Sequence, residues 1–425
     1  MDRILWNPIL IPVVLVFALG AVLIHGGRPA RDARGRPIVV YAHPPCPPEL
    51  MAYYEPAFRE FQRTHPGIDF RVLHITGNYE DKIKVMFAGN VAPDVIFMYP
   101  TALPAWVSLG ALAPLNRLIR KAGNVRVSDY FRPAIATFSY AGKVYGLPKD
   151  ASATIMEYNV DLFRKLGIPK PLHWNWADLL AAAKKLTADT DGDGRVDRWG
   201  LDSPPWWVFV WQNGGRILSP DKKHCSLLDD PKALAGLEFW AALRWKYQVT
   251  PTPEAHTDLS FSRMFVLQRV GMMFAMYPVV SILRKQCEFT WDIAPMPAGP
   301  AGPATDFVGS ALAVTRQSRN KSAAFEWVRW MTSPAGMRHV MSFEFPACRA
   351  LAESAEWENS APTPASKRVA VEAMAYARPP IQHPRYEEIM DELNPALDRA
   401  RRGVVSVRAA LKQAVPRVDA ILRRR

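Results

Sequence analysis

The sequence lacks the short motifs that identify many enzymes. It contains no Gly-x-Ser-x-Gly nucleophile elbow, no His-Glu-x-x-His metal motif, no phosphate loop and no dinucleotide-binding fingerprint. Cysteine is scarce, and neither a Cys-x-x-Cys pair nor a histidine at metal-ligand spacing accompanies Cys46, Cys225, Cys287 and Cys348. We therefore expect no zinc site and no catalytic centre of these classes, while a disulfide between two of the cysteines stays open.

A concentrated basic region is also absent, although 53 lysines and arginines against 40 acidic residues give a net charge of +13. The basic residues are dispersed except between Arg399 and Arg425, where they fall on one face of a predicted amphipathic helix. No aromatic residues interleave with them to stack on bases. We therefore expect no nucleic acid among the partners.

Apolar residues are abundant enough for a packed interior. Hydrophobic residues make up 49% and charged residues 22% of the 425 positions, which is typical of a globular protein. A chain of this length is too long for a domain with a single hydrophobic core, and it fits two domains of roughly 150 to 200 residues each.

The N-terminus carries an uncharged apolar run, Ile4–Ile24, which is about long enough to cross a bilayer. Ala18-Leu19-Gly20 could serve as a signal cleavage site, but the run continues beyond it. No cysteine ends the run, so a lipid anchor is not supported, and several arginines after the run argue weakly against export. We predict an uncleaved membrane anchor and linker over residues 1–36 that hold the lobes outside the cytoplasm.

Strands and helices alternate after the linker. Short β-branched and apolar runs predict strands over 37–42, 68–75 and 94–99, and helical spacing predicts helices from Pro48 to before Pro66 and over 80–88. This order predicts βαβ units and a largely parallel sheet. Ligands of such sheets bind at the carboxyl ends of the strands, so we expect the loops 43–48, 76–79 and 99–101 to line a ligand cleft.

The rest of the chain continues in the same style. The pattern predicts a helix over 176–186, a strand, turn and amphipathic helix over 307–334, and two helices after Pro384. Four tryptophans fall inside predicted amphipathic helices and are expected in the core: Trp240, Trp245, Trp327 and Trp330.

Several segments resemble the extracellular solute-binding proteins of ABC importers, the group that includes maltose-binding proteins and glycerol-phosphate binders. The most specific are AKKLTADTDGDGRVDRWGL at 183–201, WQNGGRILSPDKKHCSL at 211–227 and SRNKSAAFEWVRWMTSPAG at 318–336. The APDVIFMY strand, the YGLPKDASATIMEYNVDLFRKLGI segment and the tail HPRYEEIMDELNPALDRARRG also fit, so the resemblance runs from about Pro37 to Leu422.

The resemblance implies a periplasmic-binding-protein-like α/β fold with two lobes joined by crossing hinge strands. We expect lobe 1 over 37–149 with 305–350 and lobe 2 over 150–304 with 351–425. It also implies a periplasmic capture protein that delivers a sugar, oligosaccharide or sugar phosphate from the cleft between the lobes to the membrane subunits of an ABC permease. No cofactor is required for that function.

Four aspartates form the front half of a calcium-loop pattern. Asp189, Asp191 and Asp193 stand at loop positions one, three and five, with Gly194 at position six and Asp197 at position nine. Position twelve is a glycine, so the bidentate glutamate of a strong site is missing. The sequence leaves open a weak calcium site and a turn stabilised by aspartate side chains.

Candidate ligand contacts include one acid and one arginine. Asp150 lies where the resemblance places an acidic contact after the first crossing, and its carboxylate could accept two sugar hydroxyls or, alternatively, cap a turn. Arg349 resembles a cleft arginine that could clamp hydroxyls or a phosphate, or else form a surface salt bridge.

Aromatic and polar residues in predicted loops complete the candidate site. Flat rings pack on the C–H faces of sugars, which favours Trp207, Trp211 and Tyr277, and Trp211 precedes a glycine-rich turn that would expose it. The remaining candidates are His43, Tyr79 and Tyr99 in the expected loops, Asn213 in that turn, and Ser310 at the start of a strand.

Two alternatives to a transport protein stay open. An exported carbohydrate-active enzyme could use Asp150 and Glu157 as a glycosidase pair, although nothing in the sequence fixes their separation. A membrane-anchored ligand sensor could keep the same fold. Turnover of a glycan would identify the enzyme, and stoichiometric binding without turnover the capture protein.

Overall fold

The structure, a computed structural model, describes residues 30–202, 204–256 and 260–424. These residues form two compact units: unit 1 holds 30–97 and 314–327, and unit 2 holds 98–313 and 328–424. The limits of the predicted lobes stay a prediction. None of the helices in the described ranges is long and apolar enough to span a membrane, and the predicted anchor, Ile4–Ile24, lies outside those ranges.

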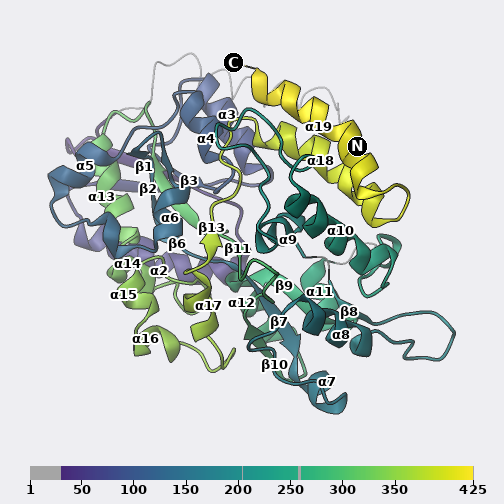
Figure 1. Cartoon of the computed structure of the whole chain (residues 1–425). Helices are drawn as coiled ribbons and strands as arrows, with labels where there is room; N and C mark the ends of the chain where they lie inside the picture. The colour runs from purple at the N-terminus through teal and green to yellow at the C-terminus, as the bar shows by residue number, and fades with distance from the viewer. Residues whose placement is uncertain (1–29, 203, 257–259, 425) are drawn as a thin grey trace, which may run out of the picture. The chain divides into compact units, whose positions relative to one another are not determined.

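Unit 1 contains the alternating strands and helices that the sequence predicts (Figure 1). Its elements are β1 (Ile38–His43), α2 (Pro48–Thr64), β2 (Asp69–His74), α3 (Tyr79–Ala88), β3 (Val95–Met98) and the start of α13 (Lys321–Met331). β1 pairs in parallel with both β2 and β3. The predicted βαβ arrangement is confirmed, and each strand begins and ends within one residue of its predicted position.

Aromatic rings fill the core of unit 1. Trp327 on α13 is fully buried, and its ring centroid lies 4.5 Å from that of Phe70 and 5.0 Å from that of Phe61. Tyr41 of β1 packs against the same indole at 5.5 Å. The predicted core position of Trp327 is therefore confirmed.

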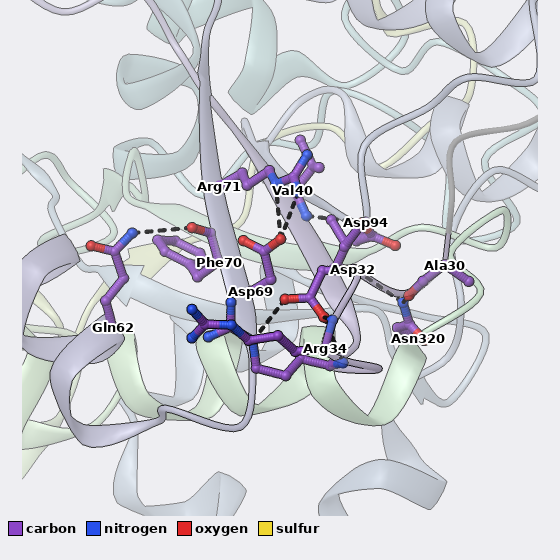
Figure 2. Close-up of polar contacts among 12 residues, drawn as sticks. Ala30, Asp32, Arg34, Val40, Gln62, Asp69, Phe70, Arg71, Asp94 and Asn320 are labelled. Atoms are coloured by element: carbon purple, nitrogen blue, oxygen red, sulfur yellow. Dashed lines mark hydrogen bonds and ion pairs between the residues drawn. The ribbon is translucent and has the colours of Figure 1, made fainter.

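Polar contacts hold the segment before β1 against unit 1 (Figure 2). The side-chain amide of Asn320 donates to the carbonyl oxygens of Ala30 and Ile38, the second at 2.9 Å. Asp32 accepts the backbone N–H of Arg34 at 2.9 Å and closes a turn. The described chain therefore enters unit 1 at a fixed point beside the start of α13.

Unit 2 holds the remaining elements. From residue 98 to residue 202 they are α4 (Leu103–Ser108), α5 (Asn116–Ala122), α6 (Arg132–Thr137), β4 (Ser139–Tyr140), β5 (Lys143–Val144), β6 (Gly146–Asp150), β7 (Thr154–Asn159), α7 (Val160–Lys165), α8 (Trp176–Leu186) and β8 (Trp199–Leu201). Up to β12 follow α9 (Trp206–Gln212), α10 (Pro231–Trp245), α11 (Phe261–Val266), β9 (Val270–Met276), α12 (Val280–Gln286), β10 (Trp291–Ala294), β11 (Thr305–Asp306) and β12 (Ser310–Val314). The last are α14 (Pro334–Arg338), α15 (Arg349–Ala352), α16 (Ala355–Glu358), α17 (Arg368–Ala373), β13 (Ala377–Arg378), α18 (Tyr386–Arg401) and α19 (Val407–Arg423).

The main sheet of unit 2 is mixed, with strand order β10-β7-β9-β8. β8 and β9 are parallel, but β7 is antiparallel to both β9 and β10. The expectation of a largely parallel sheet is wrong for this unit. Helical crossovers do make β8, β9 and β10 run in one direction, as the alternation predicts, but β7 inserts between two of them in the opposite direction.

Helices α18 and α19 form the C-terminal pair that the sequence predicts, and they pack with α9 and α10 around one hydrophobic core (Figure 1). Trp240 is buried in this core as expected. Trp245 is 52% exposed, so its predicted core position is wrong. It is the last residue of α10 and lies about 140° around the helix from Trp240, because each residue turns the helix by about 100°. Trp330 is half-buried.

Candidate functional site

Unit 2 contains a cavity of about 250 Å³. Its walls come from residues 99–101, helix α9, the end of β9, the segment 306–308 and the start of α18. The lining is mostly apolar and aromatic, and the residues that matter for its chemistry are Tyr99, Trp207, Trp211, Met276, Asp306 and Tyr386. A small apolar pocket with few polar groups is typical of a small-molecule binding site.

Helix α9 places two indole rings on the cavity wall. Trp207 and Trp211 are four residues apart, so they lie on one face of the helix. Trp207 is half-buried, and Trp211 is 9% exposed and belongs to the core of unit 2 as well. The sequence analysis expects the glycine-rich turn after Trp211 to expose this residue, but Trp211 lies inside α9, which continues through Gln212 and ends at Asn213, and its side chain is nearly fully buried.

An arginine stacks on the second of these indoles. The guanidinium carbon of Arg378, on β13, lies 5.8 Å from the ring centroid of Trp211. Cation–π attraction holds such a pair and fixes the orientation of the indole. Burial lowers the pKa of Arg378, although the group stays charged at neutral pH.

Asp306 is the acid of the cavity, and the sequence analysis missed it. It lies on the short strand β11, which pairs in parallel with β13 and brings it opposite Arg378 in the ladder. Its Oδ2 accepts the indole N–H of Trp207 at 2.9 Å, whereas the buried Oδ1 has no partner at hydrogen-bonding geometry. Burial raises the pKa of Asp306, and hydrogen bonds from Thr154 and Trp207 partly oppose this.

Two tyrosines complete the lining. Tyr99 is 39% exposed and follows β3, as the strand-end rule predicts. Tyr386 begins α18, and burial together with the nearby Glu387 and Asp306 raises its pKa to about 12. Its hydroxyl therefore stays neutral at physiological pH and can both donate and accept a hydrogen bond. In the sequence, only one indication pointed to Tyr386 as a residue that could line a site, which is its position beside the predicted start of a helix.

Asp150 and Ser310 bind each other. The backbone N–H of Ser310 donates to Oδ1 of Asp150 at 3.1 Å, its hydroxyl donates to Oδ2, and Nζ of Lys149 lies 3.1 Å from the same Oδ2. Lys149 also pairs with Glu344, so a buried cluster of charged groups surrounds the end of β6. These contacts favour an internal role for Asp150, and a ligand contact of either residue stays a prediction.

Glu157 does not offer the second carboxyl of a glycosidase. It lies in the middle of β7 with an exposed fraction of 0%, between Met273 of β9 and Ile293 of β10. Neither carboxyl oxygen has a partner at hydrogen-bonding geometry. A carboxyl enclosed in a sheet cannot reach a glycosidic bond, which removes the specific pair that the enzymatic alternative used.

Three further candidates of unit 2 are not among the residues that line the cavity. Tyr277 is 1% exposed and packs against Phe345 and Trp357. Asn213 ends α9 and donates its amide to the carbonyl of Lys232 at 2.7 Å. Arg349 is an exposed first residue of α15. Their ligand contacts stay predictions.

The two candidates of unit 1 are buried. His43 is 1% exposed at the end of β1, and its ring lies 4.7 Å from that of Tyr54. Tyr79 is 6% exposed, and its hydroxyl donates to the carbonyl of Ala42 at 3.1 Å and accepts the N–H of Phe97 at 2.9 Å. The Tyr79 side chain therefore links the carboxyl ends of β1 and β3.

The aspartate loop folds around its own backbone. Single carboxylate oxygens of Asp189, Asp191 and Asp193 lie within 4.8 Å of one another. Asp189 accepts the N–H groups of Gly192 at 2.7 Å and Gly194 at 2.8 Å, and these bonds lower its pKa. Asp197 accepts the N–H of Thr190 at 2.9 Å and also binds its hydroxyl. The loop fits the interpretation as an aspartate-stabilised turn, and calcium binding stays a prediction.

Among the described residues, Cys225, Cys287 and Cys348 are free thiols. Burial raises the pKa of Cys225 and of Cys287 to about 12, so neither is a reactive thiolate at neutral pH.

Known proteins share this fold over nearly the whole chain. A putative binding protein of Brucella abortus (strain 2308) is 26% identical over 382 residues, which cover 88% of this chain and 90% of the relative. An ABC substrate-binding protein of Listeria monocytogenes superposes with a TM-score of 0.80 at 23% identity, covering 91% of this chain and 98% of its own. The cyclic α-maltosyl-1,6-maltose binding protein of Arthrobacter globiformis gives 0.78 at 20% identity, with coverages of 91% and 99%.

These similarities confirm the predicted α/β fold class. The family model of bacterial extracellular solute-binding proteins matches residues 47–338, which is more than half of the chain. The match also includes the three segments that carry the predicted resemblance. The chain therefore belongs to the family of bacterial extracellular solute-binding proteins.

Proposed function

We propose that the protein is the substrate-binding component of an ABC importer and that it captures a carbohydrate in the cavity of unit 2. The observation that carries the proposal is the pair of indoles, Trp207 and Trp211, on one wall of a cavity that also holds a buried acid. Aromatic faces bind the C–H faces of sugar rings, and a carboxylate accepts their hydroxyls.

The relatives support a carbohydrate as the ligand. The Listeria protein was solved in complex with cycloalternan, and the Arthrobacter protein is named for a cyclic maltose derivative. The cavity volume of about 250 Å³ lies just below the range of about 300–1,000 Å³ that is common for ligand pockets, which favours a small sugar or one end of a longer one. Binding without catalysis follows from the same proposal, and so does delivery to a permease.

A thermal-shift screen tests the ligand class. We expect a sugar at a hundred times its dissociation constant to stabilise the protein by about 2.7 kcal/mol. Chromatography of the sugar after incubation should show no turnover. A folded protein that responds to no carbohydrate contradicts the proposal, and hydrolysis of the sugar contradicts its non-enzymatic part.

We also propose a weak calcium site in the loop at Asp189, which sugar binding does not require. The same thermal-shift assay, run with chelator and with millimolar calcium, tests this site.

We propose that the protein works outside the cytoplasm, held in the inner membrane by an uncleaved anchor at Ile4–Ile24. The family name, the length of the apolar run and its continuation past Ala18-Leu19-Gly20 support this. N-terminal sequencing of the native protein should find the run still attached. A mature chain that starts at Ala21 would contradict the anchor.

A further inference from the structure

Both indoles of the cavity wall contact one short ladder of strands outside their own helix. β11 pairs in parallel with β13, and β11 packs against α9 (Figure 1). Asp306 and Arg378 stand opposite each other in this ladder, so their side chains lie next to each other on one face of it. Trp207 and Trp211 are neighbours on one face of α9. Two adjacent side chains of the ladder therefore meet two adjacent side chains of the helix.

The first contact is a hydrogen bond at the edge of the Trp207 ring. The indole N–H donates to Oδ2 of Asp306 at 2.9 Å, and a hydrogen bond from Thr154 of β7 holds the same carboxyl group. Asp306 is 4% exposed, so water competes little for this bond. The bond does not require an ionised carboxyl, because a neutral one also keeps acceptor oxygens. Trp207 is only half-buried, and this bond therefore restrains a side chain that packing alone does not enclose.

The second contact is the cation–π contact of Arg378 with Trp211, at 5.8 Å from the guanidinium carbon to the ring centroid. The backbone carbonyl of Arg378 accepts the N–H of Phe307 at 2.8 Å, which fixes the backbone of Arg378 in the ladder. Arg378 is exposed and is not among the residues that line the cavity. Its contact with Trp211 therefore reaches the cavity through the indole.

We infer that Asp306 and Arg378 are positioning residues, which hold the two indoles of the binding site in their stacking orientation before the ligand arrives. This inference rests on the proposed function, because it concerns the same indoles. Ordering a large side chain during binding costs affinity, and a ring that is already held does not incur this cost. The β11–β13 ladder therefore strengthens sugar binding through Trp207 and Trp211.

Nuclear magnetic resonance of the full-length protein without ligand tests the hydrogen bond. With isotopically labelled tryptophan, the substitutions Trp207→Phe and Trp245→Phe identify the two indole N–H signals by removing them. We expect the N–H of Trp207 to exchange with water at least about tenfold more slowly than that of Trp245, which is 52% exposed. Asp306→Leu should abolish this protection, and Asp306→Asn, whose amide oxygen can accept the N–H, should keep most of it. Equally fast exchange at Trp207 and Trp245 in the wild type overturns the inference for Asp306.

Isothermal titration calorimetry with maltose and with cycloalternan measures the effect on binding. We expect Asp306→Leu to weaken binding by about three- to tenfold, and Asp306→Asn to restore most of the loss. In a Trp207→Phe background, which keeps a ring but has no N–H to hold, Asp306→Leu should change the affinity by less than about twofold. A loss of equal size in both backgrounds means that Asp306 does not act through Trp207, and it overturns the positioning role.

Arg378→Met tests the second contact, because it removes the cation and keeps a long chain that can pack on the indole. We expect this variant to bind the sugar about two- to fivefold more weakly, and Arg378→Lys, which keeps the charge, to lose less. The matched control is Arg368→Met, since Arg368 is an exposed arginine of the same unit that does not line the cavity. It should keep the wild-type affinity. Equal affinities of Arg378→Met and Arg368→Met overturn the role of Arg378.

The outcomes separate the inference from the proposed function. If folded wild-type protein responds to no sugar in the thermal-shift screen, the proposed function fails and the inference fails with it. If the protein binds a sugar but the Asp306 and Arg378 variants bind it as tightly as the wild type, only the inference fails. If neither maltose nor cycloalternan binds, the sugar with the largest thermal shift replaces them. Melting curves of each variant establish that the measured affinities belong to folded protein.

Discussion

Glu157→Met should stabilise the protein at neutral pH by about 1–3 kcal/mol, the usual cost of a buried polar group without a partner. Glu157 is enclosed in β7, with Met273 opposite on β9 and Ile293 opposite on β10. Methionine has a similar length and adapts its shape to the space, so the replacement should create no cavity. Urea unfolding at 25 °C measures the difference.

The gain should depend on pH in one direction. Burial raises the pKa of Glu157 well above its ordinary value of 4.5, although the backbone N–H groups of Glu157 and Ala275 partly oppose this. The stability that the protonated carboxyl contributes is complete below its ordinary pKa and is lost as the pH rises through the raised value. The advantage of Glu157→Met should therefore be larger at pH 8 than at pH 5. Glu157→Gln, which removes the charge but keeps a polar group, should show the same trend, and an advantage independent of pH would refute the assignment.

Trp211→Ala should lower the free energy of unfolding by roughly 3–5 kcal/mol, because it empties a large volume of the unit 2 core. The remaining folded protein should also bind its sugar more weakly, by about 1–3 kcal/mol, since the same indole lines the cavity. Urea unfolding and calorimetry on folded protein measure the two losses separately.

Two other tryptophans serve as controls for Trp211. Trp207→Ala should lose affinity with a smaller loss of stability, because Trp207 is half-buried. Trp245→Ala should change stability by no more than about 0.5 kcal/mol and leave affinity unchanged, since Trp245 is 52% exposed. A Trp211→Ala protein as stable and as tight-binding as wild type would remove this residue from both the core and the site.

The sequence predicted unit 1 closely because its strands and helices alternate along the chain. β1 pairs in parallel with β2, one crossover away, and with β3, two crossovers away, so short-range alternation was enough to predict that these strands are parallel. The same reasoning failed for β7, whose partners β9 and β10 come from far downstream. Periodicity indicates that a segment is a strand, but it does not indicate which strand lies beside it.

Some of the residues that line the cavity were predicted as candidate ligand contacts. Their large flat side chains led to Trp207 and Trp211, and the strand-end rule led to Tyr99. Asp306 was not predicted because β11 has only two residues, too few to show the alternation of a strand. Its burial also depends on the indole of Trp207 and on the start of α18, which are distant in the sequence. Ser310 and Lys149 both contact Asp150, whose contact with a ligand stays a prediction.

The insertion of β7 also affects how the protein can fold. Thr154 pairs with Met276 and Met156 with Ala294, so β7 meets its partners only after more than about a hundred further residues are available. Pairing over such distances is slow, and an apolar strand that waits for partners is prone to aggregate. A chain that ends before Trp291 lacks β10 and should leave β7 without one neighbour, so we expect the downstream half of unit 2 to be necessary for the solubility of the upstream half.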